Sequence, residues 1–161
     1  MIPNINEIRM NRQDIWNAIT VVYPVCKQGL EIECDIGYNL SVGRKRGQNL
    51  WGISSEDHTK KWVENGVNIY CKHMKPSEIT YDKDMFDVVI NNNDIKVKTK
   101  AEATRILKNI KKVCSFRAYL NLPITKKLNK SWWLKTMVNL GFVVEVFHTT
   151  TQNTLVVELQ C

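Results

Sequence analysis

Three carboxylates alternate along one stretch of the sequence, at Glu31, Glu33 and Asp35. Clusters of carboxylates hold the divalent metal ions of many nucleases, so this spacing raises the question of metal-assisted chemistry. The residues between them are apolar, and alternate side chains of a strand point to opposite faces. We therefore interpret the three carboxylates as the solvent-exposed face of a strand, and we predict no metal site.

The histidines offer one candidate motif. The segment His148–Thr150 contains an HxT sequence, and two such motifs are typical of two-histidine phosphodiesterases. The second copy is missing, because His58–Lys60 has a lysine where the second hydroxyl is needed and His73–Lys75 also departs from the pattern. We interpret His148 as a surface residue in a turn and predict no catalytic residue.

The sequence has five cysteines, and none of them belongs to a CxxC motif. Their odd number and wide spacing argue against a disulfide framework and against a zinc site. Most of them lie in apolar segments, where a free thiol packs as a small hydrophobe. We expect all five to be reduced and no cofactor to be bound. The cysteines are Cys26, Cys34, Cys71, Cys114 and Cys161.

Length and composition indicate one folded domain. The chain has 161 residues, of which 43% are hydrophobic, and a net charge of +7. No apolar run approaches the roughly 20 residues of a membrane span, and the polar N-terminus lacks a signal-peptide core. We expect a cytoplasmic protein with no membrane contact. Its positive charge favours an anionic partner, whether nucleic acid or an acidic protein surface.

Hydrophobic periodicity then places the elements that would position these residues. A helix is predicted over 12–23, ended by Pro24, and a long strand with alternating apolar residues over 30–42. The GRKRG sequence at 43–47 is predicted to be a hairpin loop that returns into a strand at 49–53. Further strands are predicted at 67–74, 86–90, 95–98, 115–122, 142–147 and 154–159, and helices from 54 or 55 to 65 and at 131–140.

The clearest helix signal lies in the second half of the chain. Thr99 and Glu102 form a predicted capping box for a helix over 100–113. In a capping box, the side chain of each residue accepts a hydrogen bond from the backbone N–H of the other. Strands cluster and helices lie between them. The sequence therefore predicts a single α+β domain, residues 1–161, with a mainly antiparallel sheet and three to four helices.

The order of elements from Phe86 to Leu159 resembles the N-acetyltransferase (GNAT) superfamily. The resemblance rests on this strand and helix order and on the Leu-Gly-Phe sequence at 140–142, which commonly ends the last helix of that family. It implies acyl transfer from acetyl-CoA. The family grips the pyrophosphate with a glycine-rich turn, whereas the corresponding segment 91–100 has no glycine. This departure argues against the activity and leaves a GNAT-like fold.

Two basic segments are candidate binding surfaces. Arg44, Lys45 and Arg46 lie in the predicted hairpin loop, where they could contact phosphates, contact an acidic protein surface or serve as a solvated turn. Trp133 belongs to the apolar face of the helix at 131–140, whereas Trp132 falls on the polar side. The candidate protein-binding residues are Trp132, Lys135, Arg44, Lys45 and Arg46, and the candidate nucleic-acid-binding residues are Arg105, Lys108 and Lys112.

In size and residue usage the chain resembles the small early proteins of T-even-type bacteriophages, among them the phage inhibitor of the host Lon protease. This resemblance implies a non-enzymatic protein that binds and inhibits a host enzyme, for example an ATP-dependent protease. The two alternatives are a nucleic-acid-binding protein and a GNAT-like acyltransferase. A host protein is the expected partner, nucleic acid is the second, and a homodimer stays open.

Overall fold

The computed structural model describes residues 16, 17, 19, 24 and 26–161. Most of the helix expected over 12–23 lies outside the described residues, although Trp16, Asn17 and Ile19 are helical. The strands are β1 (Gln28–Ile32), β2 (Asn49–Ser54), β3 (Cys71–His73), β4 (Phe86–Asn91), β5 (Cys114–Pro123), β6 (Val143–Thr149) and β7 (Thr154–Gln160). The helices are α3 (Tyr38–Lys45), α4 (Thr59–Glu64), α5 (Lys100–Val113) and α6 (Lys130–Asn139), with one short turn of helix, η1 (Pro76–Glu78).

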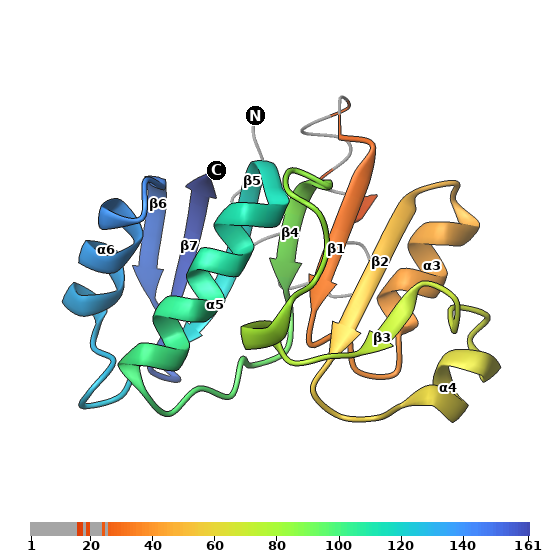
Figure 1. Ribbon diagram of the computed structural model, residues 1–161, viewed down its shortest axis with the longest axis horizontal. Helices are drawn as coiled ribbons and strands as arrows, with labels where there is room; N and C mark the ends of the chain where they lie inside the picture. The colour runs from red at the N-terminus through yellow and green to blue at the C-terminus, as the bar shows by residue number, and fades with distance from the viewer. Residues whose placement is uncertain (1–15, 18, 20–23, 25) are drawn as a thin grey trace.

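The seven described strands form one sheet in the order β3-β2-β1-β4-β5-β7-β6. The first five strands of this order are parallel to one another, whereas β7 is antiparallel to both β5 and β6. Parallel neighbours need a long crossover connection, and helices such as α3 and α5 supply it. The expected mainly antiparallel sheet is therefore wrong, and the fold is α/β with a mostly parallel sheet (Figure 1).

The long strand predicted over 30–42 is also wrong. The strand β1 ends at Ile32, and α3 begins at Tyr38. Between them, Glu33, Asp35 and Gly37 adopt positive φ at every second residue. Polar and apolar residues alternate through this turn with the two-residue period of a strand. The sequence pattern therefore did not reveal where β1 ends.

The predicted hairpin loop at 43–47 belongs to the end of α3. Gly43 is buried inside that helix, where an added Cβ would collide with the side chain of Leu50. The close approach of α3 to β2 therefore requires a glycine here. Gly47 follows with φ +83, which is typical of a glycine that ends a helix.

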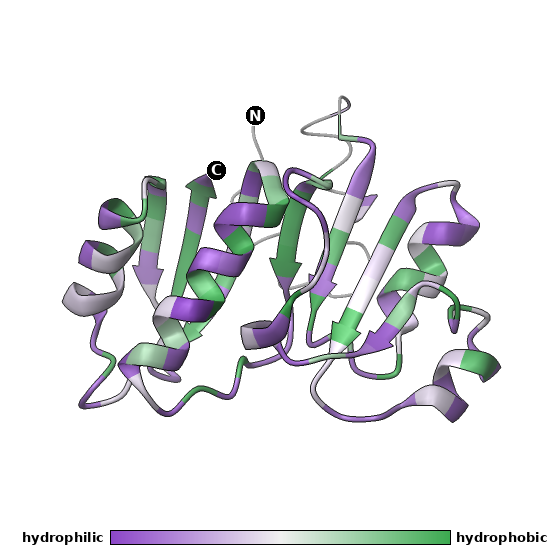
Figure 2. Cartoon of the chain, in the orientation of Figure 1, coloured by the Kyte–Doolittle hydropathy of each residue, from purple (hydrophilic) through white to green (hydrophobic). Residues whose placement is uncertain are grey.

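Apolar side chains are buried on both faces of the sheet. On β4, Val89 packs with α5 and α6 residues on one face, whereas Val88 and Ile90 pack with Leu40 of α3 on the other. Burial of alternate residues on both faces makes β4 almost continuously hydrophobic, and Figure 2 shows it green along its length. By contrast, α5 covers one face only and is striped, with hydrophobic and hydrophilic residues alternating along it (Figure 2).

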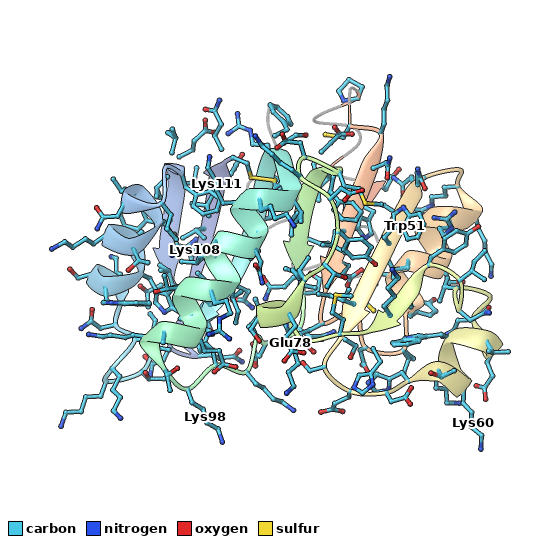
Figure 3. The ribbon with its side chains drawn as sticks, in the orientation of Figure 1. Trp51, Lys60, Glu78, Lys98, Lys108 and Lys111 are labelled. Carbon is cyan, nitrogen blue, oxygen red and sulfur yellow. A yellow bond between two sulfur atoms is a disulfide. The ribbon has the colours of Figure 1, made fainter. Side chains whose placement is uncertain are left out.

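Two smaller points concern the cysteines and the membrane. Cys114, at the start of β5, forms a disulfide with Cys161, so the expectation that all cysteines are reduced is wrong for this pair. Cys26, Cys34 and Cys71 are free. The disulfide lies close to Lys111 at the end of α5 (Figure 3). Within the described part of the chain, no helix has the length and hydropathy of a membrane span.

Candidate functional site

The order of strands marks one position where a ligand can bind. The strands β1 and β4 are neighbours in the sheet. The connection after β1 leads to β2 on one side, whereas the connection after β4 leads to β5 on the other side. In open parallel sheets, ligands bind outside the carboxyl ends of the strands at such a topological switch point. The arrowheads of β1, β2 and β4 lie together at the lower edge of the sheet in Figure 1.

The turn after β1 has an unusual backbone. Glu33 and Asp35 have φ of 54° and 52°, and Gly37, which precedes α3, has φ of 77°. A side chain with a Cβ in this left-handed region costs roughly 1–2 kcal/mol, because its Cβ crowds the following carbonyl group, and aspartate tolerates the region better than glutamate does. Two such residues within one short turn are strain of the kind that is stored at functional sites.

The strained turn presents its two carboxylates to the neighbouring loops. The carboxylate of Glu33 accepts hydrogen bonds from the backbone N–H of Ser55 at 3.2 Å and from the Ser55 hydroxyl. The carboxylate of Asp35 lies 3.2 Å from Nε2 of His58, directly before α4. The tip of β1 is thus linked through side chains to the loop that follows β2.

A cavity of about 270 Å³ opens at this edge of the sheet. The carboxylates of Glu33, Asp35, Glu56 and Asp94 line it, and Lys96 and His58 are the basic residues of its wall. Lys96 Nζ lies 2.9 Å from Glu56 Oε1, and this hydrogen bond holds the pKa of Glu56 below its usual value. Carboxylates outnumber basic groups here, so the cavity is acidic on a protein with a net charge of +7.

Asparagines fix the tip of β4 beside the turn. The buried Asn91 side chain donates to the carbonyl groups of Asn93 and Asn121, and it accepts a hydrogen bond from the Asn121 N–H at 2.8 Å. Asn93 in turn donates to the backbone carbonyl of Glu33 at 2.8 Å. The asparagine-rich segment is therefore a set of hydrogen-bonding braces that holds the turn after β1 in place.

Glu31 precedes the turn, on β1 itself, and is 1% exposed. Burial raises the pKa of its carboxyl group to about 7, against hydrogen bonds from Asn39, Trp16 and Asn92 that lower it. The interpretation of Glu31 as part of a solvent-exposed strand face is therefore wrong. Among the described residues, no three acidic, histidine or cysteine side chains are grouped so as to hold a metal ion.

Cys34 lies between the two strained residues, but its thiol is not poised as a nucleophile. A hydrogen bond with Cys71, together with burial, raises the pKa of the Cys34 thiol far above its usual range. The thiolate is the nucleophilic form of cysteine, and this environment disfavours it. The chemistry available in the cavity is therefore that of carboxylates and an imidazole.

The binding residues predicted from the sequence lie elsewhere. Arg44 ends α3 at the opposite edge of the sheet, where it donates to the Leu50 carbonyl at 2.7 Å and covers the ring of Tyr70. Lys45 and Arg46 are exposed beside it. Trp132 is half-buried against the core on α6, and Lys135 is exposed. Arg105, Lys108 and Lys112 are exposed on α5, and nucleic-acid binding there stays a prediction (Lys108 in Figure 3).

Sequence reasoning considered the cavity residues and misinterpreted them. Glu33 and Asp35 were assigned to an exposed strand face, and His58 to a failed HxT motif. A usable signal was the short strand segment 28–32, followed by acidic residues and a glycine and then by a second strand segment about 20 residues later. Strands that alternate with helices in this way indicate a parallel sheet, whose carboxyl edge would have gathered these residues.

No protein-family model matches the sequence, and no curated protein matches it. Solved structures are nevertheless similar over almost the whole chain. The PH0226 protein of Pyrococcus horikoshii is 12% identical, with a TM-score of 0.71 over 96% of this chain and 91% of that one. A TehB-like S-adenosylmethionine-dependent methyltransferase of Corynebacterium glutamicum is 12% identical, with a TM-score of 0.68 over 97% of this chain and 98% of that one.

The chain has the fold of these two structures. Other solved structures with this fold include the cyclase SpnF, which is 12% identical with a TM-score of 0.63 over 88% of this chain and 61% of that one. The same scaffold thus carries more than one chemistry, and identities this low establish the fold alone.

This likeness corrects three expectations. The resemblances to GNAT proteins and to the phage early proteins are wrong, because the similar structures include several methyltransferases and no protein of either kind among those compared above. Most segments taken as GNAT-like do form the expected helices and strands, but they continue a parallel sheet that also contains β1, β2 and β3. The hypothesis of a non-enzymatic inhibitor of a host protease is overturned as well, because the structural neighbours are enzymes.

S-adenosylmethionine is the group that this fold implies, and the cavity residues can be compared with it. The acidic lining suits a cationic sulfonium and an ammonium group. The turn after β1 does not suit it, because the carboxylate side chains of Glu33 and Asp35 line the cavity where a glycine turn would have no side chains. The eight residues that line the cavity are all polar or charged, so it offers a purine ring no apolar side chain to pack against. The residues present therefore do not fit S-adenosylmethionine.

Proposed function

We propose that this chain is an enzyme that binds a cationic small molecule in the cavity at the carboxyl edge of its sheet. The observation that carries the proposal is the convergence of Glu33, Asp35 and Glu56 on the switch point of a fold shared with enzymes. Carboxylates attract cations most strongly where water is partly excluded. Backbone strain at two of the three residues also supports a role in binding, since strain without a role would be costly.

The chemistry that the cavity offers is proton transfer. Asp35 lies at hydrogen-bond distance from Nε2 of His58, and this contact fixes the ring and its tautomer. With its proton on Nε2, the imidazole can accept another at Nδ1. Trp62 packs against the ring at 6.2 Å between centroids and limits its rotation. In the proposed enzyme His58 takes a proton from the bound cation or returns one, and Asp35 orients it.

Methyl transfer from S-adenosylmethionine is the second candidate function. The fold likeness favours it, and so does the acidic cavity, because the methyl donor is a cation. The filled turn and the polar lining count against it. We derive no step through the methyl donor for this reason.

Thermal unfolding with small probes tests the leading proposal. Choline and 1,4-diaminobutane are expected to raise the unfolding midpoint of the wild-type protein by a few degrees, whereas acetate and succinate leave it unchanged. In the variant D35N, E56Q the effect of the cations should be at least halved, because two of the attracting charges are gone. Equal shifts in the wild type and the variant would reject the cavity as the binding site, as would no shift with either cation.

S-adenosylmethionine and S-adenosylhomocysteine belong in the same experiment because they separate the two candidates. They share the adenosyl group, but only the first carries the cationic sulfonium. A shift with S-adenosylmethionine alone indicates recognition of charge and supports the cation proposal. A shift with both compounds indicates recognition of the adenosyl group and supports the second candidate.

A further inference from the structure

The turn after β1 keeps the backbone of a ligand-binding turn while carrying side chains that glycine would not have. Positive φ recurs at Glu33, Asp35 and Gly37, and only the last of these is a glycine. Glycine reaches this region without steric cost. At the first turn of an open α/β sheet, glycine also lets a ligand approach the backbone closely. The conformation is thus the one that a glycine-rich turn adopts.

Both side chains are directed across the place where the fold binds ligands. Glu33 reaches from the tip of β1 to the N–H and hydroxyl of Ser55, which directly follows β2. Asp35 reaches from the same turn to His58, directly before α4. The two side chains therefore bridge the gap between the strand tips, and the cavity that remains lies over them.

The bridging groups satisfy each other in the way that a ligand would. Ser55 offers two donors at the tip of β2, and the Glu33 carboxylate accepts both. Such donors would otherwise be met by water or by the hydroxyl and carboxylate groups of a bound molecule. The braces from Asn93 hold the backbone of Glu33 so that the bridge is built into the turn.

We propose that Glu33 and Asp35 are built-in occupants of the fold's ligand position, and that replacing both with glycine opens this position to an adenosyl ligand. The proposal concerns space at the turn and does not depend on the cationic ligand or on His58. It holds even where the cation experiment fails.

Binding of S-adenosylhomocysteine, measured by isothermal titration calorimetry, tests this inference. This probe has no transferable methyl group, so the readout is binding alone. The wild-type protein is expected to bind it with a Kd weaker than about 1 mM, and the variant E33G, D35G at least about tenfold more tightly. The variant loses the bonds to Ser55 but is relieved of the crowding at two residues, so it should still unfold cooperatively.

A matched control separates filling from charge. The variant E33Q, D35N has side chains of nearly the same size without their charge, so it should bind S-adenosylhomocysteine no better than the wild type. The single variant E33G keeps Asp35 and its contact with His58. It serves as the second test if the double glycine variant does not fold, and an intermediate gain in affinity is expected.

Three results would overturn the inference. Binding by the wild type as tight as that of the glycine variant would show that the turn is not filled. A folded glycine variant that gains no affinity would show that the side chains are not what excludes the ligand. An equal gain in E33Q, D35N would assign the exclusion to charge instead of space.

Discussion

The chemistry of the cavity depends on a few residues whose environments differ sharply over a short distance. Glu33 and Asp35 stand on strained backbone at the rim and are only partly buried or exposed. Glu31 lies two residues before Glu33, on β1, and its buried carboxylate accepts hydrogen bonds from Asn39 and Trp16. Burial raises the pKa of the Glu31 carboxyl group, so its charge responds to pH near neutrality.

At the scale of this residue, we expect stability to depend on pH through Glu31. Its folded pKa of about 7 lies above the ordinary value of 4.5, so the folded state holds the proton more tightly than the unfolded state. The stability from this group is complete below about pH 4.5 and is lost as the pH rises through 7. In the variant E31Q this loss is absent. Urea unfolding at pH 5, 6, 7 and 8 should show E31Q gaining up to about 3 kcal/mol on the wild type.

The variant E78Q is the matched control, because Glu78 is exposed on η1 (Figure 3). Its free energy of unfolding should follow that of the wild type at every pH. If the difference between E31Q and the wild type is the same at pH 5 and pH 8, Glu31 does not change its charge in this range.

A second residue prediction concerns Trp132, which was a candidate for partner binding. The structure packs it against the core, with its ring 5.1 Å from that of Trp133 and Lys100 Nζ 5.8 Å above it. W132A should therefore destabilise the protein by about 2 kcal/mol, less than a fully buried tryptophan would. V138A, at an exposed position on the same helix, should change stability by less than about 0.5 kcal/mol. An unchanged melting temperature for W132A would return Trp132 to the surface.

At the scale of the element, α5 depends on its N-terminal cap. The Thr99 hydroxyl accepts a hydrogen bond from the backbone N–H of Glu102 at 3.1 Å. The Glu102 carboxylate accepts one from the backbone N–H of Lys98. T99A should cost about 1 kcal/mol of stability, because the first turn then loses one partner for its free N–H groups. Chemical denaturation measures this cost, and T80A, at an exposed loop threonine, should cost almost nothing. Equal effects of the two substitutions would refute the cap.

The elements also show what the sequence could predict. The helix over 100–113 and its Thr99 cap are confirmed, because a strong apolar stripe and a cap are both local signals, whereas Glu102 bonds to the N–H of Lys98 and not to that of Thr99 as a capping box requires. Strand direction was wrong, since the pairing of β4 with β5 depends on how α5 crosses between them and not on either strand's own pattern. The prediction of the candidate site from the sequence was wrong for a local reason. Positive φ at every second residue of the turn continued the period of β1, and only glycine would have made such a turn visible in the sequence.

At the scale of the whole molecule, the sheet separates its two ends. The carboxyl edge of the parallel strands carries the acidic cavity, whereas Arg44 and its neighbours lie at the opposite edge. The exposed basic residues Arg105, Lys108 and Lys112 lie on α5, which covers one face of the sheet between these edges. The protein therefore has a local acidic site within a positive overall charge. Because salt screens charges over a distance of about 10 Å, this site attracts a cation at short range.

The last prediction concerns how the end of the chain is fastened. Cys161 is joined to Cys114 across 47 residues, its N–H donates to the Phe116 carbonyl at 2.9 Å, and its own carbonyl accepts from Lys111. These contacts fix the end of β7 beside β5, and in the unfolded chain the disulfide closes a loop of residues 114–161 and so lowers its conformational entropy. Its loss should lower the free energy of unfolding by about 4 kcal/mol on the loop-entropy estimate. C161S should show this loss in urea unfolding, and a reductant should produce it in the wild type but not in C161S. The free cysteine Cys26 provides the control, because C26S keeps the disulfide and should respond to reductant as the wild type does. A wild-type midpoint that does not move on reduction would show that β7 is held by its strand pairing alone.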